Sequence, residues 1–189
     1  MAVSKRLIVG LGNPGAEYSK TRHNVGFEVI DLLSEKLKIK FKTKGEAVIG
    51  WGSWKGWPLG LLKPLTYMNR SGLAVEKIVR SNKLGAKDII VVLDDINLPV
   101  GKTRIRAGGG HGGHNGLEDI IDWLDDDSFP RLRIGIGSDF ERGGQSNYVL
   151  SPFEDDERQA IDEAVSKAAD AVLFFVSGGI ETVMNQFNR

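Results

Sequence analysis

The chain has 189 residues, of which 41% are hydrophobic and 26% are charged, and this composition excludes a disordered or fibrous protein. Cysteine is absent, which excludes thiol catalysis, cysteine-based zinc or iron–sulfur sites and a disulfide framework. No run approaches the roughly 18 apolar residues of a membrane span. The first apolar run starts at Arg6, which leaves no room for a signal peptide, so we expect a cytoplasmic protein with no membrane partner.

The net charge is zero, but the charges are unevenly distributed along the chain. Residues 1–115 carry 19 Lys or Arg and 9 Asp or Glu, whereas residues 116–189 carry 6 and 16. A split of this kind indicates a basic face for a polyanion, although chance segregation of surface charge would give the same counts. Glycine is abundant at 24 residues, which indicates backbone that turns sharply or approaches a ligand closely.

Apolar runs and periodicities alternate along the chain and predict strands and helices in turn. The predicted strands are 6–11, 47–53, 58–63, 88–93, 101–106 and 132–137, with a hairpin between the second and third. The predicted helices are 25–37 with Asn24 as N-cap, 72–82 with Ser71 as cap, 117–124, 154–177 and 180–187. Residues 138–147 are glycine-rich and polar, and we expect them to form a mobile loop. The pattern predicts an α/β fold over residues 1–189: a single domain with a twisted, mixed β-sheet flanked by helices on both faces.

The segment Gly10–Gly15, GLGNPG, follows the first predicted strand and matches the glycine pattern of a dinucleotide-binding turn. That pattern requires a helix to open at the glycines, and here the helical periodicity begins only at Val25. It also requires an acid about 20 residues further on, where residues 36–44 supply lysines instead. A dinucleotide-binding oxidoreductase is therefore the weaker of the possible interpretations.

His23 lies in the loop before the first predicted helix, and Asp94 follows the strongly apolar run DIIVVL. A neutral imidazole is well suited to take a proton from water near neutral pH, and a carboxylate would orient it. The carboxyl ends of parallel strands meet at one edge of a sheet, so His23 and Asp94 could meet there. The alternatives are a capping or surface histidine and an ordinary acidic turn.

Asn69 precedes the second predicted helix, and its amide offers both a donor and an acceptor, a pair suited to a peptide bond. The tract Gly108–Gly116 contains His111 and His114, but no acid or cysteine lies within it, so we expect no metal site. Arg104 and Arg106 lead into this tract, and Arg131 and Arg133 lie on a later strand. On adjacent strands these arginines would form a basic patch for phosphates.

Five blocks of sequence, in this order, resemble the bacterial peptidyl-tRNA hydrolase family: LIVGLGNPGAEYSKTRHNVGF, KPLTYMNRSG, LDDINLPVG, GGGHGGHNGL and FPRLRIGIG. The resemblance runs from about Arg6 to Pro152. It implies a monomeric, metal-free and cofactor-free α/β esterase that cleaves the ester between a peptide and the 3′ ribose of tRNA. Its partner would be peptidyl-tRNA, and its role the recycling of tRNA from aborted translation.

The resemblance also implies roles for individual residues. His23 would be the base that activates water, Asp94 the carboxylate that orients it, and Asn13 a catalytic-site residue that holds the substrate near the ester. The side chains expected to line the site for the peptide and the tRNA 3′ end are Tyr18, Tyr67, Asn69 and Asn115. The two side chains expected to contact tRNA phosphates are Arg106 and Arg133.

Two positions depart from the family pattern. Leu93 stands where many relatives have His or Tyr, and Asn97 stands where an acid is common. Neither change removes a proposed catalytic group. A non-catalytic RNA-binding relative of the family remains an alternative, and the joint presence of Asn13, His23 and Asp94 favours the enzyme.

Overall fold

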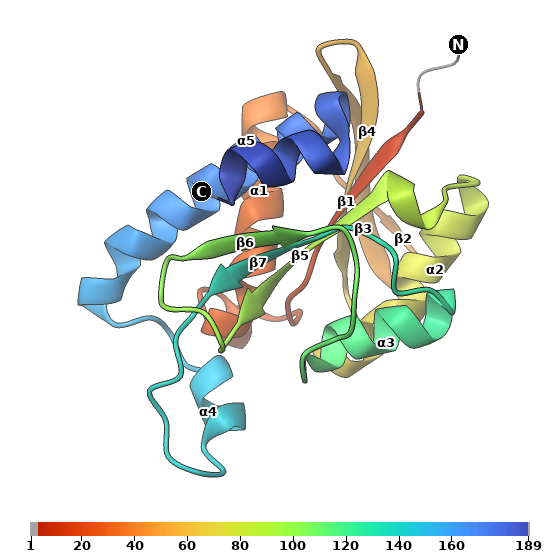
Figure 1. Cartoon of the computed structure of the whole chain (residues 1–189). Helices are drawn as coiled ribbons and strands as arrows, with labels where there is room; N and C mark the ends of the chain where they lie inside the picture. Colours follow the sequence, from red (N-terminus) through yellow and green to blue (C-terminus); the bar gives the residue numbers. More distant parts are fainter. Residues whose placement is uncertain (1–3, 189) are drawn as a thin grey trace.

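The computed structural model describes residues 4–188, and seven strands in this range form one mixed sheet (Figure 1). The strand order across the sheet is β2-β3-β4-β1-β5-β7-β6. The strands are β1 (Arg6–Gly10), β2 (Lys42–Lys44), β3 (Ala47–Trp54), β4 (Trp57–Pro64), β5 (Ile89–Asp95), β6 (Thr103–Arg106) and β7 (Arg131–Gly135). The expected mixed sheet is therefore confirmed.

The centre of the sheet is parallel and its margins are antiparallel. Strand β1 pairs in parallel with β4 and β5, and β5 pairs in parallel with β7. The hairpin β3–β4 is antiparallel, as predicted, and β2 and β6 close the two edges in antiparallel pairs. The carboxyl ends of β1, β4, β5 and β7 consequently lie along one edge of the sheet, where sites assemble in α/β folds.

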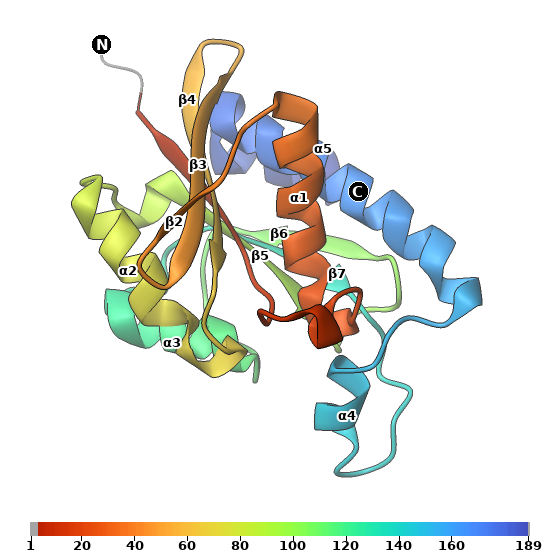
Figure 2. The ribbon, with the colours of Figure 1, turned by 180° about the vertical axis from the view of Figure 1, so that it is seen from behind.

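Helices cover both faces of the sheet (Figures 1 and 2). The two on one face are α1 (Val25–Leu37) and α5 (Asp155–Phe187), and the two on the other are α2 (Ser71–Ser81) and α3 (Asn115–Leu124). The short helix α4 (Gln145–Val149) lies beyond the sheet edge. None of the helices within residues 4–188 is long and apolar enough to cross a membrane.

Alternation along the central strands divides the core into two layers. In β5, Ile90 and Val92 pack in the cluster beneath α1 and α5, whereas Ile89, Val91 and Leu93 pack in the cluster beneath α2 and α3. All of these side chains are buried, which explains why β5 reads as a continuous apolar run. Asp94 is the next residue after this run, and it lies inside β5 rather than just past its end.

Of the two predicted caps, Asn24 is right in position and Ser71 is wrong. Asn24 stands at the N-cap position of α1, but its side chain makes no capping bond because it pairs with the backbone of Asn13 instead. Ser71 is the first residue of α2 rather than its cap, and its hydroxyl donates to the carbonyl of Met68. In both cases a tertiary or local partner competes successfully for a side chain that resembles a cap.

Three further elements differ from the expectation. Strand β2 was missed because all three of its residues are exposed and give no alternation. Helix α4 begins inside the expected loop at 138–147, and its five residues are too few to show a period. The two C-terminal helices are continuous as α5, with a break at Gly179, where φ is 76°. Only glycine takes such a backbone conformation without strain.

Candidate active site

His23 and Asp94 meet at the carboxyl edge of the sheet. His23 lies in the 3-10 turn η2 (Arg22–Asn24), directly before α1, and Asp94 is buried near the end of β5. The His23 Nδ1 atom lies 2.8 Å from Asp94 Oδ1 and 2.9 Å from Oδ2. Because an ionised carboxylate only accepts hydrogen bonds, Nδ1 carries a proton. In the neutral ring Nε2 is then the unprotonated nitrogen.

A close backbone contact brings these two residues together. A Cβ atom on Gly26, near the start of α1, would lie 2.5 Å from the carbonyl oxygen of Val92 in β5. A Cβ atom on Gly10 would lie 2.3 Å from the carbonyl oxygen of Gly26. Only glycine at both positions lets α1 approach the sheet this closely, and the approach sets His23 against Asp94.

The electrostatics of the pair favour an ionised Asp94. Burial by itself lowers the pKa of His23, but the charge of Asp94 and its hydrogen bond raise it above the ordinary value of 6.5. Burial by itself raises the pKa of Asp94, yet the nearby histidines hold it well below its ordinary value. Asp94 therefore keeps its charge across the physiological range and can stabilise a protonated His23.

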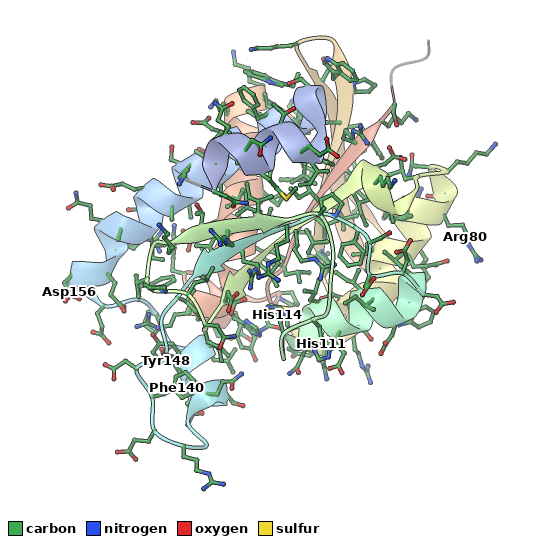
Figure 3. All side chains as sticks on the ribbon, viewed as in Figure 1. Arg80, His111, His114, Phe140, Tyr148 and Asp156 are labelled. Carbon is green, nitrogen blue, oxygen red and sulfur yellow. The ribbon has the colours of Figure 1, made fainter. Side chains whose placement is uncertain are left out.

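His114 is a second partner of Asp94 that the sequence did not reveal. Its Nε2 lies 2.9 Å from Asp94 Oδ1, and its Nδ1 accepts the backbone N–H of Leu117 at 3.2 Å. This pattern places the ring proton on Nε2, facing the carboxylate. Figure 3 shows His111 farther out on the loop, and its side chain is 41% exposed against 9% for His114. The only sequence signal for this role was the glycine tract itself.

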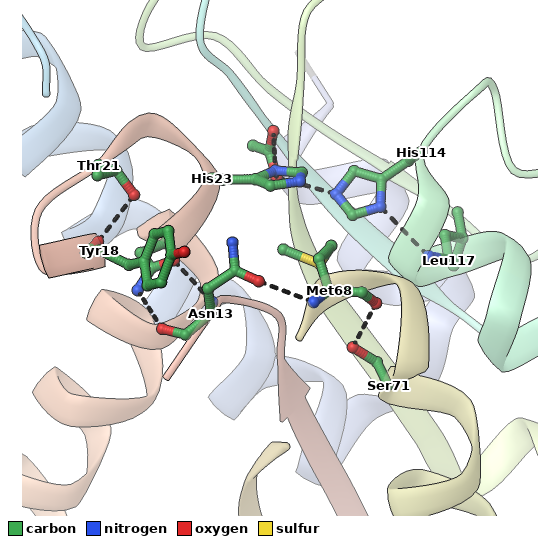
Figure 4. A network of polar contacts seen from close by, with 10 residues as sticks. Asn13, Tyr18, Thr21, His23, Met68, Ser71, His114 and Leu117 are labelled. Carbon is green, nitrogen blue, oxygen red and sulfur yellow. Dashed lines mark hydrogen bonds and ion pairs between the residues drawn. The ribbon is translucent and has the colours of Figure 1, made fainter. Parts of the chain in front are cut away.

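Asn13 is held in a fixed orientation beside His23. Its Oδ1 accepts the backbone N–H of Met68 at 2.7 Å, and its backbone N–H and C=O both pair with the side chain of Asn24, at 2.8 and 2.9 Å. With Oδ1 occupied, the amide Nδ2 is left as a donor without a hydrogen-bond partner within residues 4–188. In Figure 4 this nitrogen turns away from Met68, toward the side on which His23 lies.

The other expected substrate residues differ in their surroundings. Tyr18, in η1 (Ala16–Tyr18), and the exposed Tyr67 approach edge to face, with ring centroids 6.3 Å apart. Asn115 starts α3 and lines a cavity together with His23 and His114. Asn69, in η3 (Met68–Arg70), is exposed and makes no side-chain hydrogen bond within residues 4–188.

A cavity of about 140 Å³ joins the catalytic pair to the basic strands. It extends from His23 and Asp94, beneath the glycine tract, to the side chains of Arg106, Arg131 and Arg133. Strands β6 and β7 are adjacent, as the basic-patch hypothesis required, with Arg104 opposite Arg133 and Arg106 opposite Arg131.

The arginines of this cavity are not equivalent. Arg106 is exposed and makes no salt bridge within residues 4–188, whereas Arg133 Nη1 pairs with Asp95 Oδ2 at 2.7 Å. The buried Arg131 donates to the carbonyl oxygens of Gly109, Gly110, Asp127 and Phe129. The sequence assigned Arg131 to the phosphate patch, but its guanidinium holds the glycine tract in place.

His23, Asp94 and His114 are the one group within residues 4–188 whose ligand atoms lie close enough to hold a metal ion, within 4.8 Å of one another. However, the three separations of 2.8 to 2.9 Å from imidazole nitrogen to carboxylate oxygen are those of hydrogen bonds. The proton placement also turns an N–H, rather than a lone pair, of each ring toward Asp94. The arrangement fits proton transfer better than metal binding.

The two departures from the family pattern lie beside the pair. Leu93 is buried in the core beneath α2 and α3, and Asn97 is exposed, with its backbone N–H donating to Asp95 at 2.8 Å. Both line the cavity that contains His23. Neither contacts His23 or Asp94 through a side-chain hydrogen bond within the described range.

Comparison with known proteins identifies the family. The family model described as peptidyl-tRNA hydrolase matches residues 7–189. The chain belongs to the peptidyl-tRNA hydrolase family. It is 48% identical to the peptidyl-tRNA hydrolase of Salinibacter ruber over the full length of both chains. It is 50% identical to that of Caldanaerobacter subterraneus subsp. tengcongensis, with 96% of this chain and 98% of the relative covered.

Solved structures agree with the sequence relatives. The crystal structure of peptidyl-tRNA hydrolase from Acinetobacter baumannii superposes with a TM-score of 0.92 at 39% identity, covering 97% of this chain and 94% of that one. The resemblance found in the five sequence blocks is thus confirmed, and the protein is an enzyme that hydrolyses peptidyl-tRNA. Neither the non-catalytic RNA-binding relative nor the oxidoreductase is supported. The structure also shows why the oxidoreductase interpretation fails, because residues 11–24 contain only the short 3-10 segments η1 and η2 and no α-helix opens at the glycines.

Proposed function

We propose that His23 is the general base of peptidyl-tRNA hydrolysis and that Asp94 positions it. The observation that carries this assignment is the pair of contacts from His23 Nδ1 to both Asp94 oxygens, at 2.8 and 2.9 Å. These contacts fix the ring so that Nε2 is free to accept a proton, as in the logic of catalytic triads. His114 supports the arrangement by donating a second hydrogen bond to Asp94.

The reaction follows from this geometry. His23 Nε2 takes a proton from a water molecule as the water oxygen forms a bond to the ester carbonyl carbon. Asp94 stabilises the resulting imidazolium. The bond between that carbon and the ribose oxygen then breaks, and the proton passes from His23 to the departing ribose oxygen. The products are the free peptide carboxylic acid and tRNA.

Asn13 supplies a polar contact to the substrate. Its Nδ2 is free because Met68 occupies Oδ1, and it donates to the carbonyl oxygen of the substrate near the ester. Tyr18, Tyr67, Asn69 and Asn115 line the approach for the peptide and the tRNA 3′ end. For Tyr18 and Tyr67, the edge-to-face contact of the two rings supports this placement.

Phosphate binding falls chiefly to Arg106, which is exposed and unpaired within the described range. Arg133 lines the same cavity and contributes through the part of its guanidinium that Asp95 does not hold. We further propose that the enzyme acts as a cytoplasmic monomer without a metal or another cofactor, because the base, its partner and a polar donor all come from this one chain.

Release of tRNA from an N-acetylated aminoacyl-tRNA tests the assignment. Replacement of His23 by Ala should lower the single-turnover rate by about 10²–10⁴-fold, the usual contribution of a general base, while tRNA binding stays nearly intact. His111→Ala is the matched control, since this histidine is exposed and does not contact Asp94. A His23→Ala rate within a few-fold of the unmodified enzyme would refute the role of His23.

A further inference from the structure

The margin of the sheet that carries β2 and β3 has an excess of lysine with no part in the mechanism above. From Lys36 to Lys63 the chain has seven lysines and one acid, Glu46. Two of these lysines are paired, Lys36 with Asp170 and Lys63 with Asp31. The other five are exposed and form no salt bridge within residues 4–188: Lys38, Lys40, Lys42, Lys44 and Lys55. This margin therefore carries positive charge that the fold itself does not neutralise.

Three of the unpaired lysines project from one face of the sheet. In the register of β2 with β3, Lys42 lies opposite Ile49, which packs in the core layer beneath α2 and α3. Directly opposed residues of antiparallel strands share a face, and so do alternate residues of one strand, so Lys44 points the same way. Lys40 precedes β2 and continues the row, because its neighbour Ile39 is buried in the layer beneath α1 and α5.

An exposed indole lies beside this row of lysines. Trp51 follows Ile49 by two residues in β3, so it points to the same face, and it is 40% exposed. A Cβ atom on Gly60 would lie 2.8 Å and 3.0 Å from two carbons of the indole, so the ring lies over this glycine, on the surface of the sheet. The Lys5 ammonium lies 5.5 Å from the ring centre. Extending the β2–β3 register by two residues sets Lys40 opposite Trp51.

This surface is separate from the catalytic pair and its basic cavity. Neither Trp51 nor any of the lysines around it lines the cavity that contains His23 and Asp94. Strand β2 forms one margin of the sheet and β6 the other (Figure 2). Five strand-to-strand steps separate β3 from β6, which is about 24 Å at about 4.8 Å per step. The two basic surfaces therefore lie on opposite sides of the molecule's sheet.

We propose that the surface made by Trp51, Lys5, Lys40, Lys42 and Lys44, here named the Trp51 face, binds a single-stranded RNA segment other than the tRNA arm in the basic cavity. The indole offers a flat surface on which a base stacks, and stacking tolerates any sequence because every base has an aromatic face. The lysines of the row repeat every two residues, about 6.7 Å apart along the strand. That interval is close to the spacing of successive phosphates in an extended nucleic-acid strand.

The indole favours RNA over two other anionic partners. A lipid surface would be bound by an aromatic side chain that projects into it, whereas Trp51 lies over Gly60 on the sheet. An acidic peptide added to the free edge of β2 would pair with the backbone of that strand and would not need Trp51, which is in β3. Only a partner with flat aromatic groups and regularly spaced anions uses the indole and the lysine row together.

The first test measures the affinity of the whole enzyme for a fluorescent RNA by anisotropy. The probe is a single strand of about ten nucleotides, without self-complementarity and without an ester. Trp51→Ala should weaken binding about tenfold, as expected for the loss of one stacked base. Trp123→Ala is the matched control, since Trp123 is 48% exposed on α3 but lies next to Asp122 and away from the lysines. Equal affinity of Trp51→Ala and Trp123→Ala for the RNA would overturn the proposal.

The salt dependence of binding tests the lysine row. The double variant Lys42→Gln and Lys44→Gln should reduce the slope of log affinity against log salt by about 1.4, or about 0.7 for each phosphate contact of a single strand. The matched control is Lys83→Gln with Lys167→Gln, two exposed lysines without a salt bridge within residues 4–188. If Trp51→Ala unfolds, the lysine variant decides, because an unchanged slope would overturn the proposal.

Three further measurements identify the occupant. Arg106→Ala should retain binding that depends on Trp51, and loss of all RNA binding in this variant would place the RNA in the basic cavity instead. Hydrolysis of full peptidyl-tRNA by Trp51→Ala and by the Lys42 and Lys44 variant should show an unchanged KM, and a raised KM would assign the face to the substrate. Binding to phosphatidylglycerol vesicles, lost in the lysine variant and without any binding of the RNA, would replace the RNA by a lipid surface.

Discussion

Asp94 is the residue that both active-site histidines contact. It lies near the end of the buried strand β5 and accepts hydrogen bonds from two histidines, His23 and His114. These donors keep its pKa low, and its charge in turn raises the pKa of His23. A base whose pKa is raised toward the working pH is efficient, because it is both partly deprotonated and a strong proton acceptor.

The coupling of these residues predicts the pH dependence of catalysis. The active form of His23 is neutral, so kcat/KM should rise with pH through the pKa of His23, at a midpoint above about 6.5. Asp94→Asn removes the anion that raises this pKa, so the low-pH limb should move to lower pH. The rate should also fall sharply, because an amide can donate to Nδ1 and place the ring proton on Nε2.

A pH–rate profile of Asp94→Asn with the unmodified midpoint would show that the two residues are uncoupled. Asp88→Asn is the matched control, since this carboxylate lies just before the same strand and pairs with Arg6 far from His23. The control should change neither the midpoint nor the rate.

Among the elements, the turn η2 is held in place by a buried arginine next to the catalytic base. The Arg22 guanidinium forms two hydrogen bonds with Glu157 at the start of α5, at 2.6 and 3.1 Å, and donates to the carbonyl of Ile136. It also lies 4.3 Å from the ring centre of Tyr148 in α4. Figure 3 shows Tyr148 beside Phe140, which precedes α4 in the chain, and their ring centroids lie 5.0 Å apart. Arg22 thus links η2 to α4 and α5.

Breaking this link should cost stability. Glu157→Gln leaves the buried Arg22 without its counter-charge and should lower the free energy of unfolding at pH 7 by about 1–3 kcal/mol. Burial by itself raises the pKa of Glu157, but the hydrogen bond from Arg22 outweighs it and holds this pKa below 4.5. The contribution is therefore present above about pH 4.5 and is lost as the pH falls, so the variant and the unmodified enzyme should converge in acid.

Chemical denaturation at pH 7 and at about pH 3 measures this difference. Glu163→Gln is the matched control on α5, since Glu163 is exposed and its one side-chain hydrogen bond within residues 4–188 comes from Gln159. Equal stability of Glu157→Gln and Glu163→Gln at pH 7 would contradict a role for the Arg22 pair.

For the molecule as a whole, the basic cavity beside the catalytic pair determines how substrate binding depends on salt. Phosphate contacts contribute through counterion release, so binding weakens as salt rises. Arg106→Ala should raise KM for full peptidyl-tRNA and reduce the salt slope by about one charge. A minimal substrate with the ester and terminal nucleotide but no tRNA body should be hardly affected.

Two comparisons sharpen this prediction. Arg104→Ala is the matched control on β6, because Arg104 lies outside the cavity and contacts the carbonyl of Asn188. Arg133→Ala should behave differently from Arg106→Ala, since it also leaves Asp95, which is 8% exposed, without its salt bridge. Equal losses on the full and minimal substrates for Arg106→Ala would exclude a phosphate role.

The sequence by itself determined the α/β pattern, the β3–β4 hairpin, the buried strand β5 and the family. Periodicity fixes which face of a strand or helix is apolar, and the carboxyl ends of parallel strands gather in one place. That reasoning was sufficient to expect His23 and Asp94 at one edge, 71 residues apart in the chain.

Only the tertiary structure decided the partners of individual polar side chains. His114 joined Asp94, Asn24 paired with Asn13 instead of capping α1, and Arg133 paired with Asp95. Periodicity assigns a side chain to a face but does not specify which of several polar groups it meets there. That choice depends on distances set by the packing of α1 and α3 on the sheet.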